Sequence, residues 1–206
     1  MLSVILAVEI KVGVVMVHRI INEIEVALDN DCYIVALMGA LTLPDICGKS
    51  AYPNLERVGD RYKRWCDTYI YPKIQHTDKK DKDLDCGITP LSGEIIYSLR
   101  CYLLHQGSAD IECEKCKVEE FELLIQPKNE FGIYIDNFGA IWSNDDFEHR
   151  KRHMRLHVRN ICRDLCTAAE SYYQNHNDEF EFINYKISRI NPDAEHPWEY
   201  SKKVEW

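Results

Sequence analysis

The stretch Leu91–Ser108, with the sequence LSGEIIYSLRCYLLHQGS, decides how the first half of the chain is expected to fold. Its apolar residues recur at the three- and four-residue intervals of one buried helix face. Gly107 is the residue type that ends helices in a left-handed conformation, so we expect the helix to end just after His105. The residues expected to face the core are Ile95, Ile96, Leu99, Tyr102 and Leu103.

Two ionisable side chains lie near the end of this expected helix. Arg100 and His105 are five positions apart, which places them about 140° apart around an α-helix. They therefore do not share a helix face. They can converge only through the long arginine side chain, or with help from another surface.

The run Leu99-Arg100, four residues, then His105-Gln106-Gly107 resembles the signature of the HEPN superfamily, the higher-eukaryote and prokaryote nucleotide-binding domains. The resemblance covers about residues 19–108 and implies an up-and-down helical bundle. Many members of this superfamily are metal-independent ribonucleases that dimerise, so that two arginine–histidine pairs form one composite site. The resemblance thus implies that Arg100 and His105 are catalytic residues acting on RNA in a homodimer.

A second arginine and histidine with the same spacing, Arg152 and His157, shows that so short a pattern also arises by chance. We favour Arg100 and His105 because a leucine precedes them, a glycine follows two residues later, and the helix around them is apolar. The structural alternative is a cluster at a helix end. In that interpretation His105 lies near the negative end of the helix dipole and Arg100 lies on the surface.

Length and composition limit the classes of protein that this chain can be. A chain of 206 residues with 46% hydrophobic residues can build a real core. Its nine cysteines, an odd number spread along the chain, suit free thiols in a reducing compartment, so we expect a cytoplasmic protein. The net charge of −9 repels nucleic acid at long range, so any contact with RNA must be local.

The first residues are interpreted as an extension that precedes the domain. Residues 1–18 are apolar but carry Glu9 and Lys11, too short and too charged for a membrane span and without the features of a signal peptide. We therefore expect no membrane partner. Alternation from Val8 to Val14 favours a strand in this extension.

Helical periods then predict the first half of the domain. We expect helices over residues 20–28, 32–43 and 54–70, with a tight connection over 43–49 that contains Pro44. The inward positions of the second are Ile34, Leu37, Met38 and Leu41, and those of the third are Leu55, Val58, Tyr62, Trp65 and Tyr69. Residues 71–90 are expected to form a polar loop.

After Ser108 the composition changes. Three β-rich runs over residues 118–125, 131–135 and 138–142 predict a small antiparallel meander. A long helix is expected over residues 146–175, and a further strand over 180–187. The inward residues of this helix are Ile161, Leu165, Ala168, Ala169 and Tyr172.

The fold class that follows is α+β: a mainly α-helical HEPN-like bundle with a small antiparallel β-meander and a long C-terminal helix. We expect one domain over residues 19–190, with its helical part over 19–108 and the meander and long helix over 112–190. Residues 191–206 form a C-terminal tail.

A basic segment in the expected long helix is the second candidate for substrate binding. Arg152, Arg155 and Arg159 follow one helical stripe, so their guanidinium groups can meet successive phosphates. The alternatives are a solvated helix face and a dimer contact.

The first functional hypothesis is a HEPN-like metal-independent endoribonuclease with a composite site in a homodimer. An RNA 2′-hydroxyl attacks the neighbouring phosphate, leaving a 2′,3′-cyclic phosphate. Arg100 and His105 supply the cation and the proton-transfer group. Tyr97 and Gln106 orient the substrate or the imidazole. We expect no metal or other cofactor.

The second hypothesis is a catalytically inactive HEPN-like module that binds a nucleotide, RNA or a protein. Cys101 stands where the superfamily often has a polar residue, and this difference and the acidic net charge favour the second hypothesis. In family terms, a small standalone HEPN-like protein suggests a toxin–antitoxin or antiviral defence role, with an inhibitory protein partner.

Overall fold

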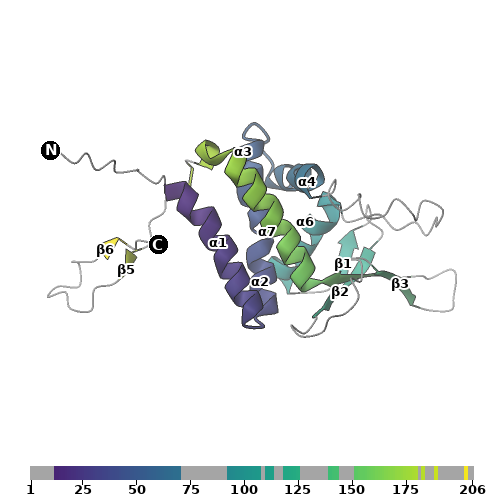
Figure 1. Ribbon diagram of the computed structural model, residues 1–206. Helices are drawn as coiled ribbons and strands as arrows, with labels where there is room; N and C mark the ends of the chain where they lie inside the picture. Colours follow the sequence, from purple (N-terminus) through teal and green to yellow (C-terminus); the bar gives the residue numbers. More distant parts are fainter. Residues whose placement is uncertain are drawn as a thin grey trace, which may run out of the picture.

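The computed structural model of this chain is mainly helical, with a small mixed sheet at one end (Figure 1). It describes residues 12–70, 92–107, 110–113, 118–125, 139–143, 151–180, 182–183, 188–189 and 202–203. The helices are α1 (Val12–Asp29), α2 (Tyr33–Ala40), α3 (Leu43–Ala51), α4 (Val58–Tyr69), α6 (Gly93–Cys101), the π-helical turn η1 (Tyr102–Gln106), α7 (Val158–Asn175) and the 3-10 turn η2 (Asn177–Phe180). The strands are β1 (Asp110–Cys113), β2 (Val118–Leu124), β3 (Gly139–Ser143), β4 (Lys151–His157), β5 (Ser188–Arg189) and β6 (Lys202–Lys203).

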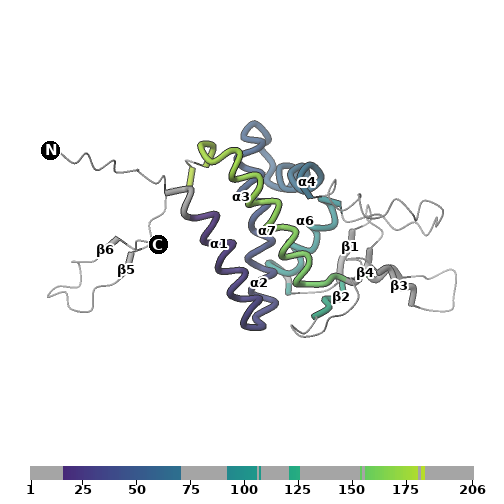
Figure 2. The backbone as a smooth tube through the Cα atoms, in the orientation of Figure 1, coloured from purple at the N-terminus to yellow at the C-terminus, as the bar shows by residue number. Residues whose placement is uncertain are grey.

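Helix α7 organises the bundle, because it packs against α1, α2 and α3 (Figures 1 and 2). It runs antiparallel to α1. Near the start of α7, Arg159 donates a hydrogen bond to the Leu28 carbonyl at the end of α1. Near its other end, Glu170 lies 3.1 Å from His18. The five residues expected to face inward from this helix are all buried, which confirms that prediction.

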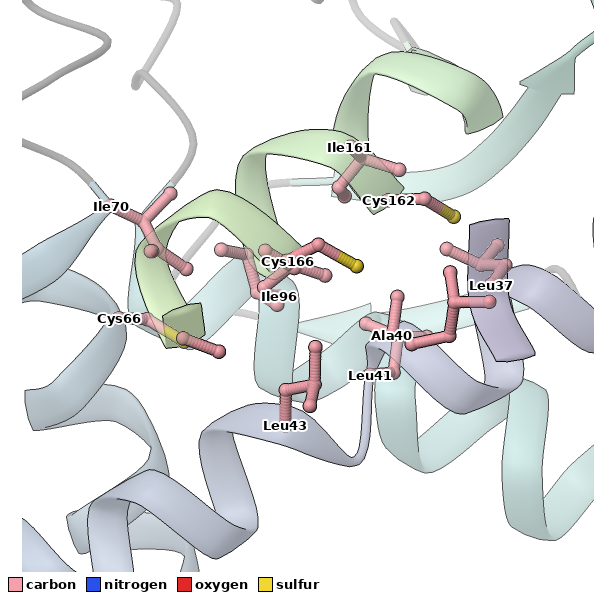
Figure 3. Close-up of a cluster of buried hydrophobic side chains, with 14 of the residues drawn as sticks. Leu37, Ala40, Leu41, Leu43, Cys66, Ile70, Ile96, Ile161, Cys162 and Cys166 are labelled. Atoms are coloured by element: carbon pink, nitrogen blue, oxygen red, sulfur yellow. The ribbon is translucent and has the colours of Figure 1, made fainter. Parts of the chain in front are cut away.

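The core draws side chains from α1, α2, α3, α4, α6 and α7, and Figure 3 shows a part of it. Leu37 and Leu41 come from α2 and the turn after it, Leu43 begins α3, and Ile96 lies on α6. All of these side chains are buried. The rest of the labelled cluster consists of Ala40, Cys66, Ile70, Ile161, Cys162 and Cys166.

The predicted strand at the N-terminus is wrong where the structure describes it. Val12 already belongs to α1, and Met16 and Val17 are buried in the core, so the domain begins before residue 19. Alternation over so few residues did not distinguish a strand from a helix whose next turn is also apolar. Residues 1–11 and the predicted loop over 71–90 lie outside the described residues.

The region around Pro44 also differs from the prediction. The predicted connection over residues 43–49 contains Pro44, but the proline lies in the first turn of α3, where its missing N–H is not needed. Residues 43–49 are therefore helical throughout, and α2 ends earlier than predicted, at Ala40. Ile34, expected to face inward, is 44% exposed.

Helices α2 and α3 together form an apolar stretch of 19 residues, Tyr33–Ala51, long enough to cross a membrane. Half of this stretch is buried inside the fold, as in a core helix of a soluble protein, and residues 41–42 form a turn within it. This stretch is therefore weak evidence for a membrane span.

Helix α4 begins at Val58 and not at residue 54, and Val58 is 46% exposed. Tyr62 and Trp65 are fully buried, as expected. Helix α4 lies close to α6: a Cβ added to Gly93 would lie 2.8 Å from the Lys63 carbonyl carbon, and closer still to the carbonyl oxygen. Only a glycine permits this approach of the two backbones.

The predicted antiparallel meander is wrong. The sheet order is β1-β2-β4-β3, and its central pair β2 and β4 is parallel, with Glu122 beside Arg155 and Leu124 beside His157. The pairs β1–β2 and β3–β4 are antiparallel. The predicted strand over residues 131–135 lies outside the described residues.

The predicted helix over residues 146–175 is wrong in its first part. Residues 151–157 form β4, and α7 begins only at Val158. The polar, charged sequence of β4 resembles an exposed helix, but pairing with β2 on one side and β3 on the other satisfies its backbone groups. The strand predicted over 180–187 is also wrong at its start, since Phe180 ends the turn η2.

Candidate functional site

The helix that carries Arg100 is fixed at its start by two hydrogen bonds. The Ser92 hydroxyl accepts one from the Ile95 backbone N–H at 3.4 Å, as an N-cap does. The Gly93 N–H donates the other to the Asp67 carboxylate of α4, at 2.6 Å. Sequence periodicity predicted this helix, and Ile95, Ile96 and Leu99 are buried as expected.

The helix changes its winding at the position of the motif. Residues 102–106 form a π-helical turn, closed by a hydrogen bond of 2.8 Å from the Gly107 N–H to the Tyr102 carbonyl. Gly107 has φ +62°, the left-handed conformation that we expected at this residue. Such a wider turn, with bonds between residues five apart, is frequent at functional sites.

The wider turn brings the two candidate catalytic side chains together. Arg100 Nη1 lies 3.0 Å from His105 Nε2. Because arginine can only donate hydrogen bonds, Nε2 is the acceptor and carries no proton. The side chain of His105 is exposed. The angle of an ideal α-helix therefore did not describe the relation between these two residues.

Asp45, in the first turn of α3, holds the other edge of the guanidinium. Both Nε and Nη2 of Arg100 donate to Asp45 Oδ2, at 3.1 and 3.0 Å. The side chains of Asp45 and Arg100 are 22% and 18% exposed, so the ion pair is largely shielded from water. The pairing of Asp45 with Arg100 has no signal in the spacing of the sequence, because only the fold brings together two residues that are 55 positions apart.

Burial and charge act in opposite directions on this pair. Burial raises the pKa of Asp45, and the charge and hydrogen bonds of Arg100, with the charge of Arg61, offset only part of that rise. For Arg100, burial alone lowers the pKa, but Asp45 and Cys101 outweigh it, so the guanidinium stays charged. The site thus pairs the charged guanidinium of Arg100 with a carboxylate whose ionised form is disfavoured by burial.

Tyr97, predicted to orient the substrate or the imidazole, lies near the same arginine. The guanidinium carbon of Arg100 is 5.9 Å from the Tyr97 ring centroid, and Lys63 Nζ is 5.1 Å from it. Burial raises the pKa of the Tyr97 hydroxyl, with a further rise from Cys101, which is hydrogen-bonded to it. The hydroxyl packs close to Gly59, where an added Cβ would lie 3.0 Å from it.

Of the remaining predicted site residues, only Arg159 has a side chain that the structure describes. Arg152 and Arg155 lie on strand β4, so the helical stripe that was expected to carry them does not exist, and their side chains lie outside the described part of the structure. The side chain of Gln106 also lies outside it. Arg159 donates to the Leu28 carbonyl at 3.0 Å and lies 5.6 Å over the Tyr33 ring, which joins α7 to α1 and α2.

A second polar cluster fixes the end of α7. The Ser50 and Tyr172 hydroxyls each donate to Glu179 Oε2 at 2.9 Å, and His176 Nδ1 lies 3.1 Å from Glu179 Oε1. In this cluster the serine contacts the carboxylate and not the imidazole, so it lacks the relay of a nucleophilic triad. Its effect is to attach η2 to α3 and α7.

The described residues contain no group of three histidine, cysteine or acidic side chains that could hold a metal ion. The six cysteines whose side chains the structure describes, residues 32, 47, 66, 101, 162 and 166, are free thiols. Burial raises the pKa of four of them, Cys47, Cys66, Cys162 and Cys166. These buried thiols are unreactive.

Comparison with known proteins finds no match for this chain among family models, curated proteins or solved structures.

Proposed function

We propose that this protein is a HEPN-like, metal-independent endoribonuclease that leaves 2′,3′-cyclic phosphate and 5′-hydroxyl ends. The observation that supports this best is the contact of 3.0 Å between Arg100 Nη1 and His105 Nε2. It joins a permanent cation to an unprotonated imidazole nitrogen at an exposed helix end, where a phosphodiester can reach both.

The two side chains suit the two needs of this reaction. His105 Nε2 can accept the proton of the 2′-hydroxyl while the 2′-oxygen attacks phosphorus. Arg100 can stabilise the negative charge that builds up on the pentavalent phosphorus. When the guanidinium turns to the phosphate, it releases Nε2 for the incoming proton. This route needs no metal, because side chains supply both the charge and the proton transfer.

The leaving 5′-oxygen needs a proton from a second acid. A second copy of the chain, placed with its own Arg100 and His105 across a two-fold axis, supplies a protonated imidazole for this step. The homodimer is therefore part of the proposal, and so are RNA as substrate, a cytoplasmic location and an inhibitory protein partner.

The test is cleavage of structured and single-stranded RNA by the purified full chain in excess EDTA. Cleavage with cyclic phosphate ends is expected for the native chain. Arg100→Ala and His105→Ala should each lower the rate by roughly 10²–10⁴, the range for loss of one acid–base or oxyanion-stabilising group. Arg64→Ala is the matched control, since Arg64 is exposed on α4 and stacks on Tyr52 at 4.8 Å. Equal rates in all three variants would remove the assignment.

A catalytically inactive binding module is the second candidate. Asp45 favours it, because this carboxylate already occupies two donors of Arg100. This candidate predicts RNA or nucleotide binding that depends on Arg100, with no cleavage at any protein concentration.

A further inference from the structure

Asp45 uses only one of its two carboxylate oxygens. Oδ2 accepts both hydrogen bonds from Arg100, whereas Oδ1 is buried and has no hydrogen-bond partner. A buried acceptor without a donor is costly, so such an atom in a native fold needs an explanation.

A donor in the same situation belongs to Arg61. Its Nε is also buried and without a hydrogen-bond partner, and its positive charge acts on Asp45. The Arg61 guanidinium is held by a hydrogen bond of 2.7 Å from Nη1 to the Leu55 carbonyl. Helices α3 and α4 approach closely here, since a Cβ on Gly48 would lie 3.0 Å from the Arg61 carbonyl oxygen. Asp45 therefore has a fixed arginine on α4 as well as the arginine on α6.

The cost of this carboxylate argues that its charge serves function and not stability. A carboxyl group whose pKa is raised in the folded state binds its proton more tightly there than in the unfolded chain. The free energy of unfolding therefore falls as the pH rises from the pKa of this carboxyl in the unfolded chain through its raised pKa in the folded protein. At neutral pH the ionised Asp45 then lowers the stability of the fold. Residues that lower stability in this way are typical of functional sites.

We propose that Asp45 is a positioning residue that holds Arg100 in the empty site and shifts to Arg61 when a phosphodiester binds. The inference rests on the proposed function, because it takes the Arg100 and His105 site as the phosphate site. An arriving phosphate competes with Asp45 for the Arg100 donors and repels its charge. Arg61 then takes over the carboxylate, through the Nε and Oδ1 atoms that lack partners in the empty site. Arg61 thereby sets the affinity for phosphate without touching it.

The experiment measures binding of a 2′-O-methyl RNA oligonucleotide to the full chain by fluorescence anisotropy. This RNA cannot be cleaved by 2′-hydroxyl attack, so binding is separated from catalysis. Arg61→Gln should weaken binding by at least about tenfold, within the usual range for coupling between sites. Arg64→Gln removes the same charge three residues further along α4 and should weaken binding by less than about threefold, as one exposed charge does.

Two further substitutions test whether a loss of affinity in Arg61→Gln acts through Asp45. Asp45→Asn should bind at least as tightly as the native chain, and adding it to Arg61→Gln should restore most of the lost affinity, because no carboxylate then clamps Arg100. Arg61→Lys keeps the charge and should bind nearly as the native chain does, which covers the case in which Arg61→Gln fails to fold. In NMR titrations, Arg61→Gln should raise the pKa of Asp45 further, whereas Arg64→Gln should leave it unmoved.

The outcomes separate the inference from the proposed function. Equal losses of affinity for Arg61→Gln and Arg64→Gln, or no restoration by Asp45→Asn, overturn the inference even if the native chain cleaves RNA. A loss specific to Arg61→Gln that Asp45→Asn restores supports the inference even if no RNA is cleaved, and it then favours the binding module. Failure of the native chain to bind the oligonucleotide overturns the inference.

Discussion

The close approach of α4 and α6 at Gly93 gives a quantitative test of how the fold supports the site. A Cβ at residue 93 would lie 2.8 Å from two backbone atoms of Lys63, where ordinary contacts begin at 3.4 Å. Backbone cannot rotate away as a side chain can, and the Lys63 carbonyl oxygen is closer still, so Gly93→Ala must move one helix relative to the other by about 1 Å. Overpacking of this kind costs about 1–3 kcal/mol.

We expect the loss of stability in Gly93→Ala to lie at the upper end of that range, about 3 kcal/mol, because the helix movement would also distort the hydrogen bond from the Gly93 N–H to Asp67. With a urea m-value of about 2 kcal/mol/M, the midpoint of unfolding falls by about 1.5 M. The shift also reaches the site, because α6 carries Arg100. Moving α6 by up to about 1 Å stretches the 3.0 Å hydrogen bond between Arg100 and Asp45 to the upper limit of hydrogen-bond distance or past it.

The matched control is Gly39→Ala in α2, where an added Cβ meets only the Ile24 side chain, at 3.0 Å. The gain of about 1 kcal/mol in helix propensity offsets that small crowding, so its midpoint should stay close to the native one. Urea unfolding followed by circular dichroism measures both variants. Midpoints of Gly93→Ala and Gly39→Ala that differ by less than about 0.5 M would refute the reasoning from backbone contact.

Three further predictions concern stability alone. Ser92→Ala should cost about 1 kcal/mol through loss of the N-cap of α6, measured by thermal unfolding; an unchanged midpoint would mean that the cap contributes nothing. Arg159→Ala should cost about 2 kcal/mol, because the Leu28 carbonyl loses its donor, whereas Arg163→Ala on the exposed side of α7 should cost little; equal costs in urea contradict this. Burial raises the pKa of Glu179, but its hydrogen bonds outweigh burial and lower it below the ordinary 4.5, so its contribution to stability is present above that pH and is lost as the pH falls below it. Glu179→Gln should therefore lose less stability than the native chain between neutral pH and pH 3, and parallel curves of stability against pH would count against the pairing.

Sequence periodicity predicted those features of the fold that depend only on residues within one helix. The buried stripe of α7 from Ile161 to Tyr172 and the glycine end after His105 follow from residues within a turn or two of each other. Strand β4 did not follow, because the short alternation of Met154 and Leu156 lies among charged residues, and its conformation is set by pairing with β2, 33 positions away in the sequence. Local patterns carry no information on such pairing.

In the candidate site, too, the sequence predicted what lies within one helix and missed what other helices contribute. The sequence singled out Arg100 and His105, but the spacing of an ideal helix placed them on different faces, and only the π-helical turn accounts for their contact. The relation of Asp45 and Arg61 to Arg100 could not be predicted, because no local spacing relates α3 and α4 to α6. Their place beside Arg100 depends on how α3, α4 and α6 pack in the fold.

The parallel pairing of β2 with β4 sets the order in which a growing chain can fold. Parallel strands need a long connection, so β2 has no partner on that side until β4 has left the ribosome. Helix α7, which covers α1, α2 and α3, is made later still. A nascent or truncated chain that ends before residue 158 contains Asp45, Arg100 and His105 but lacks the helix that buries the face of α3. Synthesis of α7 is therefore a condition for assembling the site, and fragments released before it should carry the motif without its geometry.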